Sequence, residues 1–194
     1  MLKKMSNWKP SRVSATDPLT IVTPTYMKIL KTFLSDPVQQ YHEREIARRA
    51  GVRSGAANKV LRLMAEEGVL DRQRMGRMVL YSLDLGSPTA RQFKVLANVI
   101  LLEGLLSKLR PLTKRVILFG SCSLGTDVRE SDIDIMILAD KRQGVTSEIA
   151  KFNSRAERQI APIIVDANEF ARLRRVDKPL YDNIERGIVL WESQ

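Results

Sequence analysis

Two aspartates, Asp132 and Asp134, stand beside an apolar run in the segment ILFGSCSLGTDVRESDIDIMIL, residues 117–138. An unpaired charge at the edge of a hydrophobic core is costly, so two carboxylates in this position require a counter-charge. At positions i and i+2 of a strand they would project from the same face and repel each other unless a cation lay between them. Mg²⁺ suits such a pair, because it is bound by one or two carboxylates together with substrate phosphates. The pair therefore predicts a Mg²⁺ site.

The loop before the two aspartates contains small residues that could contact phosphate. Gly120 and Ser121 follow an apolar strand, and Gly125 comes four residues after Ser121. Glycines let the backbone approach a phosphate closely, and a serine at the start of a helix can offer its hydroxyl and free N–H groups to phosphate oxygens. We expect Gly120, Ser121 and Gly125 to bind a nucleotide.

The complete pattern is an apolar strand, GSxxxG, SDxD and a second apolar strand. It resembles the signature of the DNA polymerase beta-like nucleotidyltransferase superfamily in its minimal form, over roughly residues 112–194. The resemblance implies a small mixed α/β domain. It also implies transfer of a nucleoside monophosphate from a nucleoside triphosphate to an acceptor, with Mg²⁺ and with Asp132 and Asp134 as catalytic metal ligands.

The resemblance further implies a third carboxylate from a later strand, which helps to activate the attacking hydroxyl. The strand in question is IAPIIVDANEF, residues 160–170, and its one acid before Glu169 is Asp166. Asp166 is thus the candidate third catalytic residue. However, Asp166-x-x-Glu169 also has the pattern of a helix capping box, in which Asp166 would bind backbone N–H groups and no metal. Both readings remain open at this stage.

Residues 22–86 have the organisation of a second, separate domain. The pattern predicts a helix, a short helix ending at Gly51, a helix capped by Ser54, and two strands around Met75-Gly76-Arg77. This order, with the phrase EIARRAGVRSGAANKVLRLMAEEGVL, resembles the winged helix-turn-helix domains of bacterial and archaeal transcription regulators. In such domains the second helix of the turn motif enters the DNA major groove, and the wing contacts the backbone or the minor groove.

The resemblance implies an interface for double-stranded DNA on this helix and wing. Its residues would be Arg53, Ser54, Asn58, Lys59, Arg62, Arg72, Arg74 and Arg77. Charge agrees with this interpretation, since residues 1–84 carry 15 Lys/Arg against 8 Asp/Glu within a total net charge of +10. The alternative is that the domain is a protein–protein module with a solvated basic face.

The segment 87–111 predicts one long helix with Ser87 as N-cap and Pro88 in its first turn. Its apolar residues form a wide stripe made of Phe93, Leu96, Ile100, Leu101, Leu105 and Leu109. Such a helix could join the two domains, pack on the second, or pair with another chain. A homodimer would also suit a regulator that reads two half-sites.

The expected fold class is therefore α+β: a winged helix domain followed by a small mixed α/β nucleotidyltransferase domain. The predicted boundaries are a flexible basic arm at 1–21, the winged helix domain at 22–86, a linker helix at 87–111 and the nucleotidyltransferase domain at 112–194.

Composition excludes several classes of protein. A single cysteine, Cys122, excludes an internal disulfide framework, and with a single histidine, His42, it also excludes a structural zinc site. The N-terminus lacks the pattern of a signal peptide, and no apolar run is long enough to span a membrane. We expect a cytoplasmic protein.

Three functions fit these observations. The leading one is an enzyme, a DNA-binding nucleotidyltransferase that modifies an unknown acceptor. The second is a transcription regulator without catalysis, whose transferase-like domain binds nucleotide or mediates assembly. The third is an antitoxin-like component that modifies a partner protein. The position of Asp166 in space separates a complete set of catalytic acids from an incomplete one.

Overall fold

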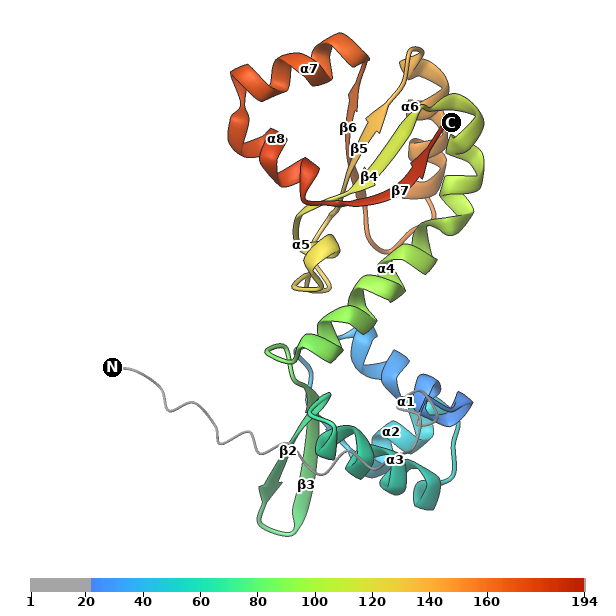
Figure 1. Cartoon of the computed structure of the whole chain (residues 1–194). Coiled ribbons are helices and arrows are strands. Elements are labelled where there is room, and N and C mark those ends of the chain that lie inside the picture. Colours follow the sequence, from blue (N-terminus) through green and yellow to red (C-terminus); the bar gives the residue numbers. More distant parts are fainter. Residues whose placement is uncertain (1–21, 194) are drawn as a thin grey trace, which may run out of the picture.

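A computed structural model describes residues 22–193, which form two modules joined by one long helix (Figure 1). The basic arm predicted at residues 1–21 lies outside the described residues. The predicted mixture of helices and sheets is confirmed, since both modules combine an antiparallel or mixed sheet with helices.

The N-terminal module contains three helices and a three-stranded antiparallel sheet in the order β1-β3-β2. Its elements are α1 Pro24–Ser35, β1 Tyr41–His42, α2 Glu43–Ala50, α3 Ser54–Glu66, β2 Leu70–Met75 and β3 Met78–Leu83. The predicted helices and the hairpin are therefore present. β2 and β3 pair in register from Leu70–Leu83 to Met75–Met78, which leaves Gly76 and Arg77 as the tip.

Local signals account for most of these helix ends. The Thr23 hydroxyl accepts a hydrogen bond from the N–H of Tyr26, and Pro24 occupies the first turn of α1. Gly51 ends α2 in the left-handed conformation, with φ 63°, as predicted. The prediction that Ser54 caps α3 is wrong: Arg53 occupies the N-cap position and makes no capping hydrogen bond, while Ser54 is the first helical residue.

One core holds the N-terminal module together. Ile29, Phe33, Ile46 and Leu61 are completely buried in it, together with Ala90 from the beginning of the long helix. The long helix is therefore part of this core as well as a connection to the second module.

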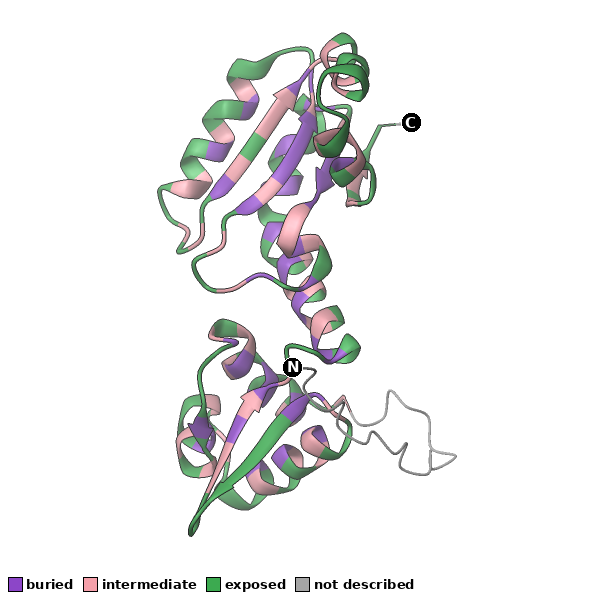
Figure 2. Cartoon of the chain, turned by 90° about the vertical axis from the view of Figure 1, so that its left-hand side faces the viewer, coloured by how far each residue is buried: buried purple, intermediate pink, exposed green. Residues whose placement is uncertain are grey.

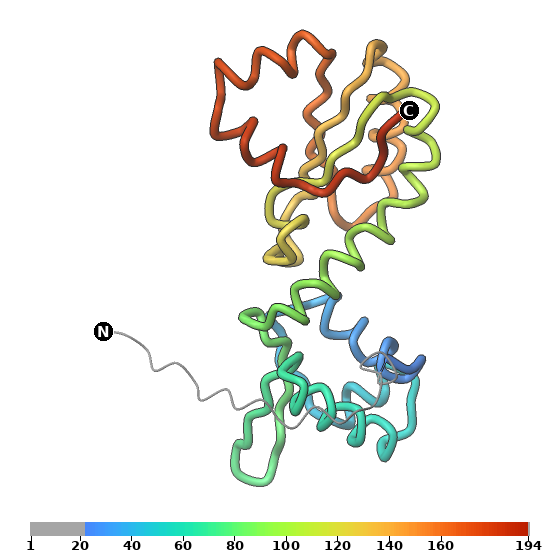
Figure 3. The backbone as a smooth tube through the Cα atoms, viewed as in Figure 1, coloured from blue at the N-terminus to red at the C-terminus, as the bar shows by residue number. Residues whose placement is uncertain are grey.

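That helix is α4, Pro88–Leu109, and a short 3₁₀ turn, η2 Arg110–Leu112, follows it. The predicted start is confirmed, because the Ser87 hydroxyl accepts a hydrogen bond from the N–H of Ala90 and Pro88 lies in the first turn. The second half of α4 buries Leu102 and Leu106 in the core of the C-terminal module. One rigid element thus contributes to both cores (Figure 3).

The predicted apolar stripe of α4 is only partly correct. Leu105 and Leu109 are buried, but Leu96 and Leu101 are each 47% exposed and Ile100 is 64% exposed. The buried face of the first half carries Lys94 and Asn98 in their place. The spacing of apolar residues predicted that Leu96 and Ile100 would be buried in this half of the helix. In the structure the buried positions are instead those of Lys94 and Asn98.

The C-terminal module is a four-stranded sheet between two layers of helices (Figure 1). The strand order is β6-β5-β4-β7, in which β5 and β6 are parallel and the other pairs are antiparallel. Its elements are β4 Arg115–Leu118, α5 Gly120–Leu124, β5 Ile133–Leu138, α6 Arg142–Asn153, β6 Ile160–Val165, α7 Ala167–Val176, α8 Lys178–Glu185 and β7 Ile188–Glu192.

The two faces of this sheet pack on different helices. One face, with Val116, Leu118 and Ile135, packs on α4 and α6, and the other, with Ile117 and Met136, packs on α7 and α8. Figure 2 shows the buried positions concentrated along the central strands and on the helix faces that cover them. The helix α6 covers Arg142–Asn153, and β7 is the edge strand of the sheet beside β4.

Among residues 22–193, no helix has the length and apolar character needed to cross a membrane.

Candidate functional site

The two aspartates of the opening segment lie at the beginning of β5. Asp134 is the second residue of that strand and is half-buried, while Asp132 directly precedes the strand and is exposed. Burial raises the pKa of the Asp134 carboxyl above its usual range, and the negative charge of Asp132 raises it further. The two carboxylates therefore interact through space as the i, i+2 spacing predicts, and a cation between them would relieve their repulsion.

Gly120 allows the loop to approach Asp134 closely. Its φ is 68°, in the left-handed region, and a Cβ added to it would lie 2.5 Å from Oδ2 of Asp134. Every residue with a side chain would collide with this carboxylate and would also be strained in its backbone. The structure thus brings Gly120 and Asp134 into direct contact, across the junction between β4 and the short helix α5.

Ser121 is half-buried next to Gly120 in the first turn of α5, which has no side-chain cap at its N-terminus. The predicted phosphate loop and the two carboxylates therefore meet at one end of the sheet. Their oxygen ligands and their mutual repulsion fit Mg²⁺, a hard ion that binds carboxylates together with phosphate oxygens.

Glycine is needed at position 125 for a different reason than at position 120. It ends α5 in the left-handed conformation, with φ 66°, and an added Cβ would lie 2.3 Å from the carbonyl oxygen of Arg91 on α4. The glycine is therefore required for close packing of the loop on the backbone of α4. Its predicted contact with nucleotide stays a prediction.

A network of buried polar groups lies directly behind this loop, and no sequence motif predicted it. Asp127, in the segment between α5 and β5, is only 5% exposed, and Lys94 of α4 is only 3% exposed. Lys94 Nζ lies 3.5 Å from Asp127 Oδ1 and also donates to the Asp127 backbone carbonyl. Removal of one partner from such a buried pair costs about 3–5 kcal/mol, because the other charge is left uncompensated.

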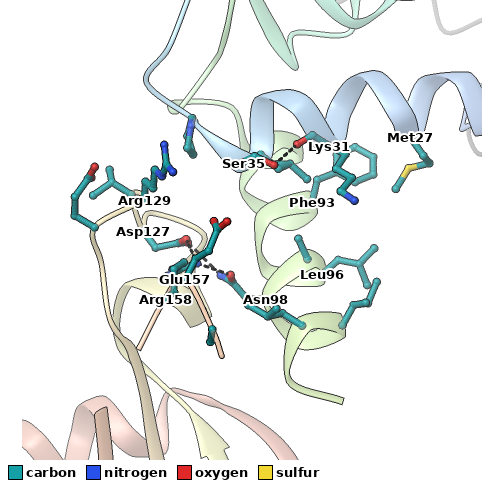
Figure 4. Close-up of a pocket in the computed structure, with 18 of the residues that line it drawn as sticks. Met27, Lys31, Ser35, Phe93, Leu96, Asn98, Asp127, Arg129, Glu157 and Arg158 are labelled. Atoms are coloured by element: carbon teal, nitrogen blue, oxygen red, sulfur yellow. Dashed lines mark hydrogen bonds and ion pairs between the residues drawn. The ribbon is translucent and has the colours of Figure 1, made fainter. Parts of the chain in front are cut away.

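Arg158, in the segment before β6, completes this network (Figure 4). Its Nη1 lies 3.1 Å from Asp127 Oδ2 and donates to Oδ1 of Asn98 at 3.0 Å. Its Nε donates to the carbonyl of Ser131 at 3.1 Å, and its Nη2 contacts Sγ of Cys122 at 2.9 Å. One guanidinium therefore holds the backbone directly before Asp132 and the thiol of the phosphate loop.

Burial is the main influence on the pKa values of Lys94 and Cys122 in this network. Burial lowers the pKa of Lys94, and Asp127 opposes that effect. Burial raises the pKa of the Cys122 thiol, although Arg158 acts against it. Cys122 is thus a buried thiol that packs in the core and accepts a contact from Arg158. One sequence feature could have indicated this network: Lys94 and Asn98 are two polar residues four positions apart within an otherwise apolar part of the helix.

Asp166 lies at the other end of the sheet. Parallel pairing sets Asp134 beside Ala161 and Leu138 beside Val165, so Asp166 follows the far end of β6. Five residues of parallel strand correspond to about 16 Å along β6. The Asp166 carboxylate accepts the N–H of Glu169 at 2.8 Å, and the Glu169 carboxylate accepts the N–H of Asp166 at 2.8 Å. The capping box is the reading that the structure shows, and we remove Asp166 from the candidate site.

No acid replaces Asp166 beside the pair. On the same face of the sheet the neighbour of Asp134 on β6 is Ala161, and on the β4 side its carbonyl accepts the N–H of Phe119. Within residues 22–193, no group of three His, Cys, Asp or Glu side chains is placed to hold a metal. The site therefore has two carboxylates, supplied by Asp132 and Asp134.

The residues predicted for DNA lie on α3 and on the hairpin β2–β3. Seven of the eight are exposed: Arg53, Ser54, Lys59, Arg62, Arg72, Arg74 and Arg77. Asn58 differs, because it is half-buried and its amide donates to the Glu43 carboxylate of α2. Asn58 therefore ties α3 to α2 in this structure, and it would have to leave Glu43 before it could read a base.

Comparison with known proteins agrees with the geometry of the C-terminal module. Residues 100–190 match the family model described as a nucleotidyltransferase domain. This match includes the second half of α4, which begins before the predicted boundary at residue 112. The nucleotidyltransferase part of the resemblance is thus supported. No curated protein matches the chain.

The contact between Gly120 and Asp134 leads to a first prediction. Gly120→Ala should lower the free energy of unfolding by about 2 kcal/mol, because alanine is strained at positive φ and its Cβ meets the carboxylate. Chemical denaturation measures the change. Gly55→Ala in α3 is the matched control, since no atom lies within 4 Å of its added Cβ and its φ is not positive. Equal stability of the Gly120→Ala variant and the wild type would contradict this account.

The pKa of Asp134 leads to a second prediction. Because this pKa is higher in the folded than in the unfolded protein, ionisation of Asp134 disfavours folding as the pH rises. Asp134→Asn should therefore raise the melting temperature at pH 7. The gain should shrink as the pH falls and vanish below about 3.9, where the aspartate is protonated in both states. Asp132→Asn should act in the same direction. Thermal unfolding from pH 7 to pH 3 tests this, and a destabilised Asp134→Asn variant at pH 7 would refute it.

Proposed function

We propose that the C-terminal module binds a nucleoside triphosphate together with Mg²⁺, and that the N-terminal module is a winged helix domain that binds double-stranded DNA. The observation that carries the first part is the contact between the Gly120–Ser121 loop and the Asp132–Asp134 pair. Phosphate-binding groups and metal-binding carboxylates converge there at one end of the sheet. The family match at residues 100–190 supports the same assignment.

Each residue has a defined task in this proposal. The backbone of Gly120 and the hydroxyl of Ser121 bind phosphate oxygens, and Asp132 and Asp134 hold the metal. Mg²⁺, when bound, neutralises negative charge on the carboxylates and the phosphates. The network of Asp127, Lys94 and Arg158 keeps the segment before Asp132 in position.

The lack of a third carboxylate favours a regulatory use of the nucleotide over rapid turnover. Ala161 occupies the strand position beside Asp134, so no side chain there can act as a general base toward an acceptor hydroxyl. The first candidate function is accordingly a DNA-binding regulator that senses a nucleotide. The second, favoured by the family match, is slow transfer of a nucleoside monophosphate to an acceptor such as a partner protein.

Nucleotide binding is the third prediction. Titration calorimetry with ATP, GTP, CTP and UTP in Mg²⁺ should show at least one saturable interaction. Asp132→Ala and Asp134→Ala should each weaken it on the order of tenfold or more, because they remove metal ligands. Asp166→Ala is the matched control: it should cost about 1 kcal/mol of stability through loss of the cap and leave binding unchanged.

The same variants separate the two candidate functions. Labelled nucleoside triphosphate is incubated with the protein, Mg²⁺ and cell extract, and transfer of label to an acceptor is followed on a denaturing gel. Label that disappears with Asp134→Ala establishes transfer, whereas binding without label establishes sensing. Absence of any nucleotide binding, or binding that Asp134→Ala leaves intact, would refute the proposed site.

The DNA-binding part of the proposal is supported by the arrangement of charge on the N-terminal module. Three helices followed by a hairpin is the order of a winged helix domain, and α3 is the helix that would enter the major groove. Lys59 and Arg62 are exposed on this helix, and Arg77 is exposed at the tip of the hairpin. Long cationic side chains at these places can reach phosphates on both sides of the groove.

DNA binding is the fourth prediction. The affinity for a random-sequence duplex should fall steeply with salt, and Lys59→Ala or Arg62→Ala should each reduce the slope of log K against log salt concentration by about 1. Fluorescence anisotropy over a range of salt concentrations measures this slope. Arg175→Ala, an exposed arginine on α7 of the other module, should leave it unchanged. An equal effect of Arg175→Ala and Lys59→Ala would contradict a DNA interface on α3.

A further inference from the structure

The first half of α4 presents an apolar surface that no other part of the described chain covers. Leu96, Ile100 and Leu101 are 47%, 64% and 47% exposed. With the half-buried Phe93 and Ala97 they form two neighbouring rows, in which successive residues are four positions apart and lie on one face of the helix. We call Leu96, Ile100, Leu101 and Gly104 the α4 surface.

Gly104 is a second, independent observation at the same place. It continues the row of Leu96 and Ile100 in the interior of a 22-residue helix. Glycine is less favourable than alanine inside a helix, but its missing side chain lets another backbone approach closely. Within the described chain no atom lies within 4 Å of a Cβ added to Gly104. Residues 22–193 of one chain therefore supply no close neighbour that would explain the glycine.

Leu96, Ile100 and Leu101 of the α4 surface line one side of an open groove of about 1110 Å³. Figure 4 shows Lys31 and Met27 of α1 on one side of this groove and Arg129 and Glu157 on the other. The charges on the α1 side are the two lysines Lys28 and Lys31. The opposite side includes Glu130 and Glu157, flanked by arginines.

These charged side chains form no ion pair with other described residues of the chain. Among the ion pairs formed by residues 22–193, none involves Lys28, Lys31, Glu130 or Glu157. The lysines on one side of the groove are opposite in charge to the two glutamates on the other side, beside which Arg129 and Arg155 also lie. In a two-fold contact whose axis runs along the groove, each side of one copy meets the opposite side of the second copy.

We propose that two copies of this chain associate through the α4 surface, with α4 of one copy packed on α4 of the other. Leu96, Ile100 and Leu101 form the apolar centre, and Gly104 lets the two helices approach closely. Lys28 and Lys31 of each copy face Glu130 and Glu157 of the other copy at the rim. Charges of both signs around one apolar face favour a second copy over a partner that carries a single sign of charge.

This association goes beyond nucleotide and DNA binding and does not depend on either. It would, however, connect them. α4 contributes Ala90 to the core of the N-terminal module and Lys94 to the network behind Asp132. A pair of chains joined at α4 would therefore present two α3 helices and two nucleotide sites from one central contact.

The fifth prediction concerns the mass of the free protein in solution. Light scattering coupled to gel filtration, without nucleotide or DNA, should give about twice the chain mass of 22.0 kDa and a return to the single-chain mass on dilution. Ile100→Glu should yield the single-chain mass. Val176→Glu is the matched control, because Val176 is 77% exposed on α7, away from the α4 surface, and its variant should remain a dimer.

Gly104→Leu separates loss of association from loss of folding. The space around Gly104 is open within one chain and leucine favours a helix, so the variant should be at least as stable as the wild type while its dimer dissociates. A wild-type chain that stays single at every concentration up to its solubility limit overturns the proposal. So does a dimer that survives both Ile100→Glu and Gly104→Leu.

Charge reversal tests the arrangement of the two copies. Lys28→Glu/Lys31→Glu and Glu130→Lys/Glu157→Lys should each weaken the dimer when measured alone. An equal mixture of the two variants should restore it, because every rim contact in the mixed pair again joins opposite charges. A mixture that associates no better than either variant overturns this two-fold arrangement. Because these experiments contain no nucleotide and no DNA, their failure is distinguishable from failure of the proposed function.

Discussion

The buried carboxylate of Asp127 is the constraint on which the position of the candidate site depends. A charge taken out of water must be compensated, and here Lys94 and Arg158 supply the compensation from two separate segments. Asp127 therefore holds the side chains of Lys94 and Arg158 in place, and they in turn hold the carboxylate of Asp127. Arg158 extends the same set of contacts to Ser131 and Cys122, so the segment leading to Asp132 is held from behind. The pair of carboxylates at the start of β5 depends on an ionic cluster in which Lys94 and Asp127 are buried and Arg158 is half-buried.

Two glycines make the resulting geometry possible, each for a separate contact. Gly120 admits the Asp134 carboxylate against the loop, and Gly125 admits the backbone of α4 on the other side. The short helix α5 is consequently held between β5 and α4. A phosphate loop fixed on both sides loses little conformational freedom when it binds a ligand, which favours binding. Because α4 contacts α5 and also packs on α1 in the core of the N-terminal module, it connects the Gly120–Gly125 loop with that module.

The chemistry available at this site is that of binding and charge neutralisation. Phosphoryl-type transfer relies mainly on positioning and electrostatic stabilisation, for which a fixed loop and two carboxylates are suited. Activation of an acceptor hydroxyl is a separate requirement, and the strand position where an acid would serve it holds Ala161. The carboxylate of Asp166 instead stabilises the first turn of α7. The same domain architecture can therefore hold two carboxylates beside a glycine loop while Ala161 occupies the strand position next to them.

Local patterns in the sequence were sufficient to predict most helices and strands, the Gly120–Ser121 loop and the Asp132–Asp134 pair. The apolar runs predicted the strands β5 and β6, and short-range signals predicted the caps at Ser87 and Asp166, because these depend on residues three or four positions apart. The interaction of Asp132 with Asp134 followed from strand geometry alone. Ser54 shows the limit of such signals, since one residue decided whether it capped α3 or began it.

The tertiary structure decided everything that depends on distant segments. That Lys94, Asn98, Asp127 and Arg158 form one buried cluster could not be read from the chain, because partners 29 to 60 positions apart meet only when α4 packs on the loop. The same packing turned Leu96 and Ile100 outward and Lys94 inward, against the hydrophobic pattern. Strand register alone placed Ala161 beside Asp134 and Asp166 at the far end of the sheet. The sequence by itself thus determined the nucleotide loop and its two carboxylates, whereas strand pairing and burial determined which further residues reach them.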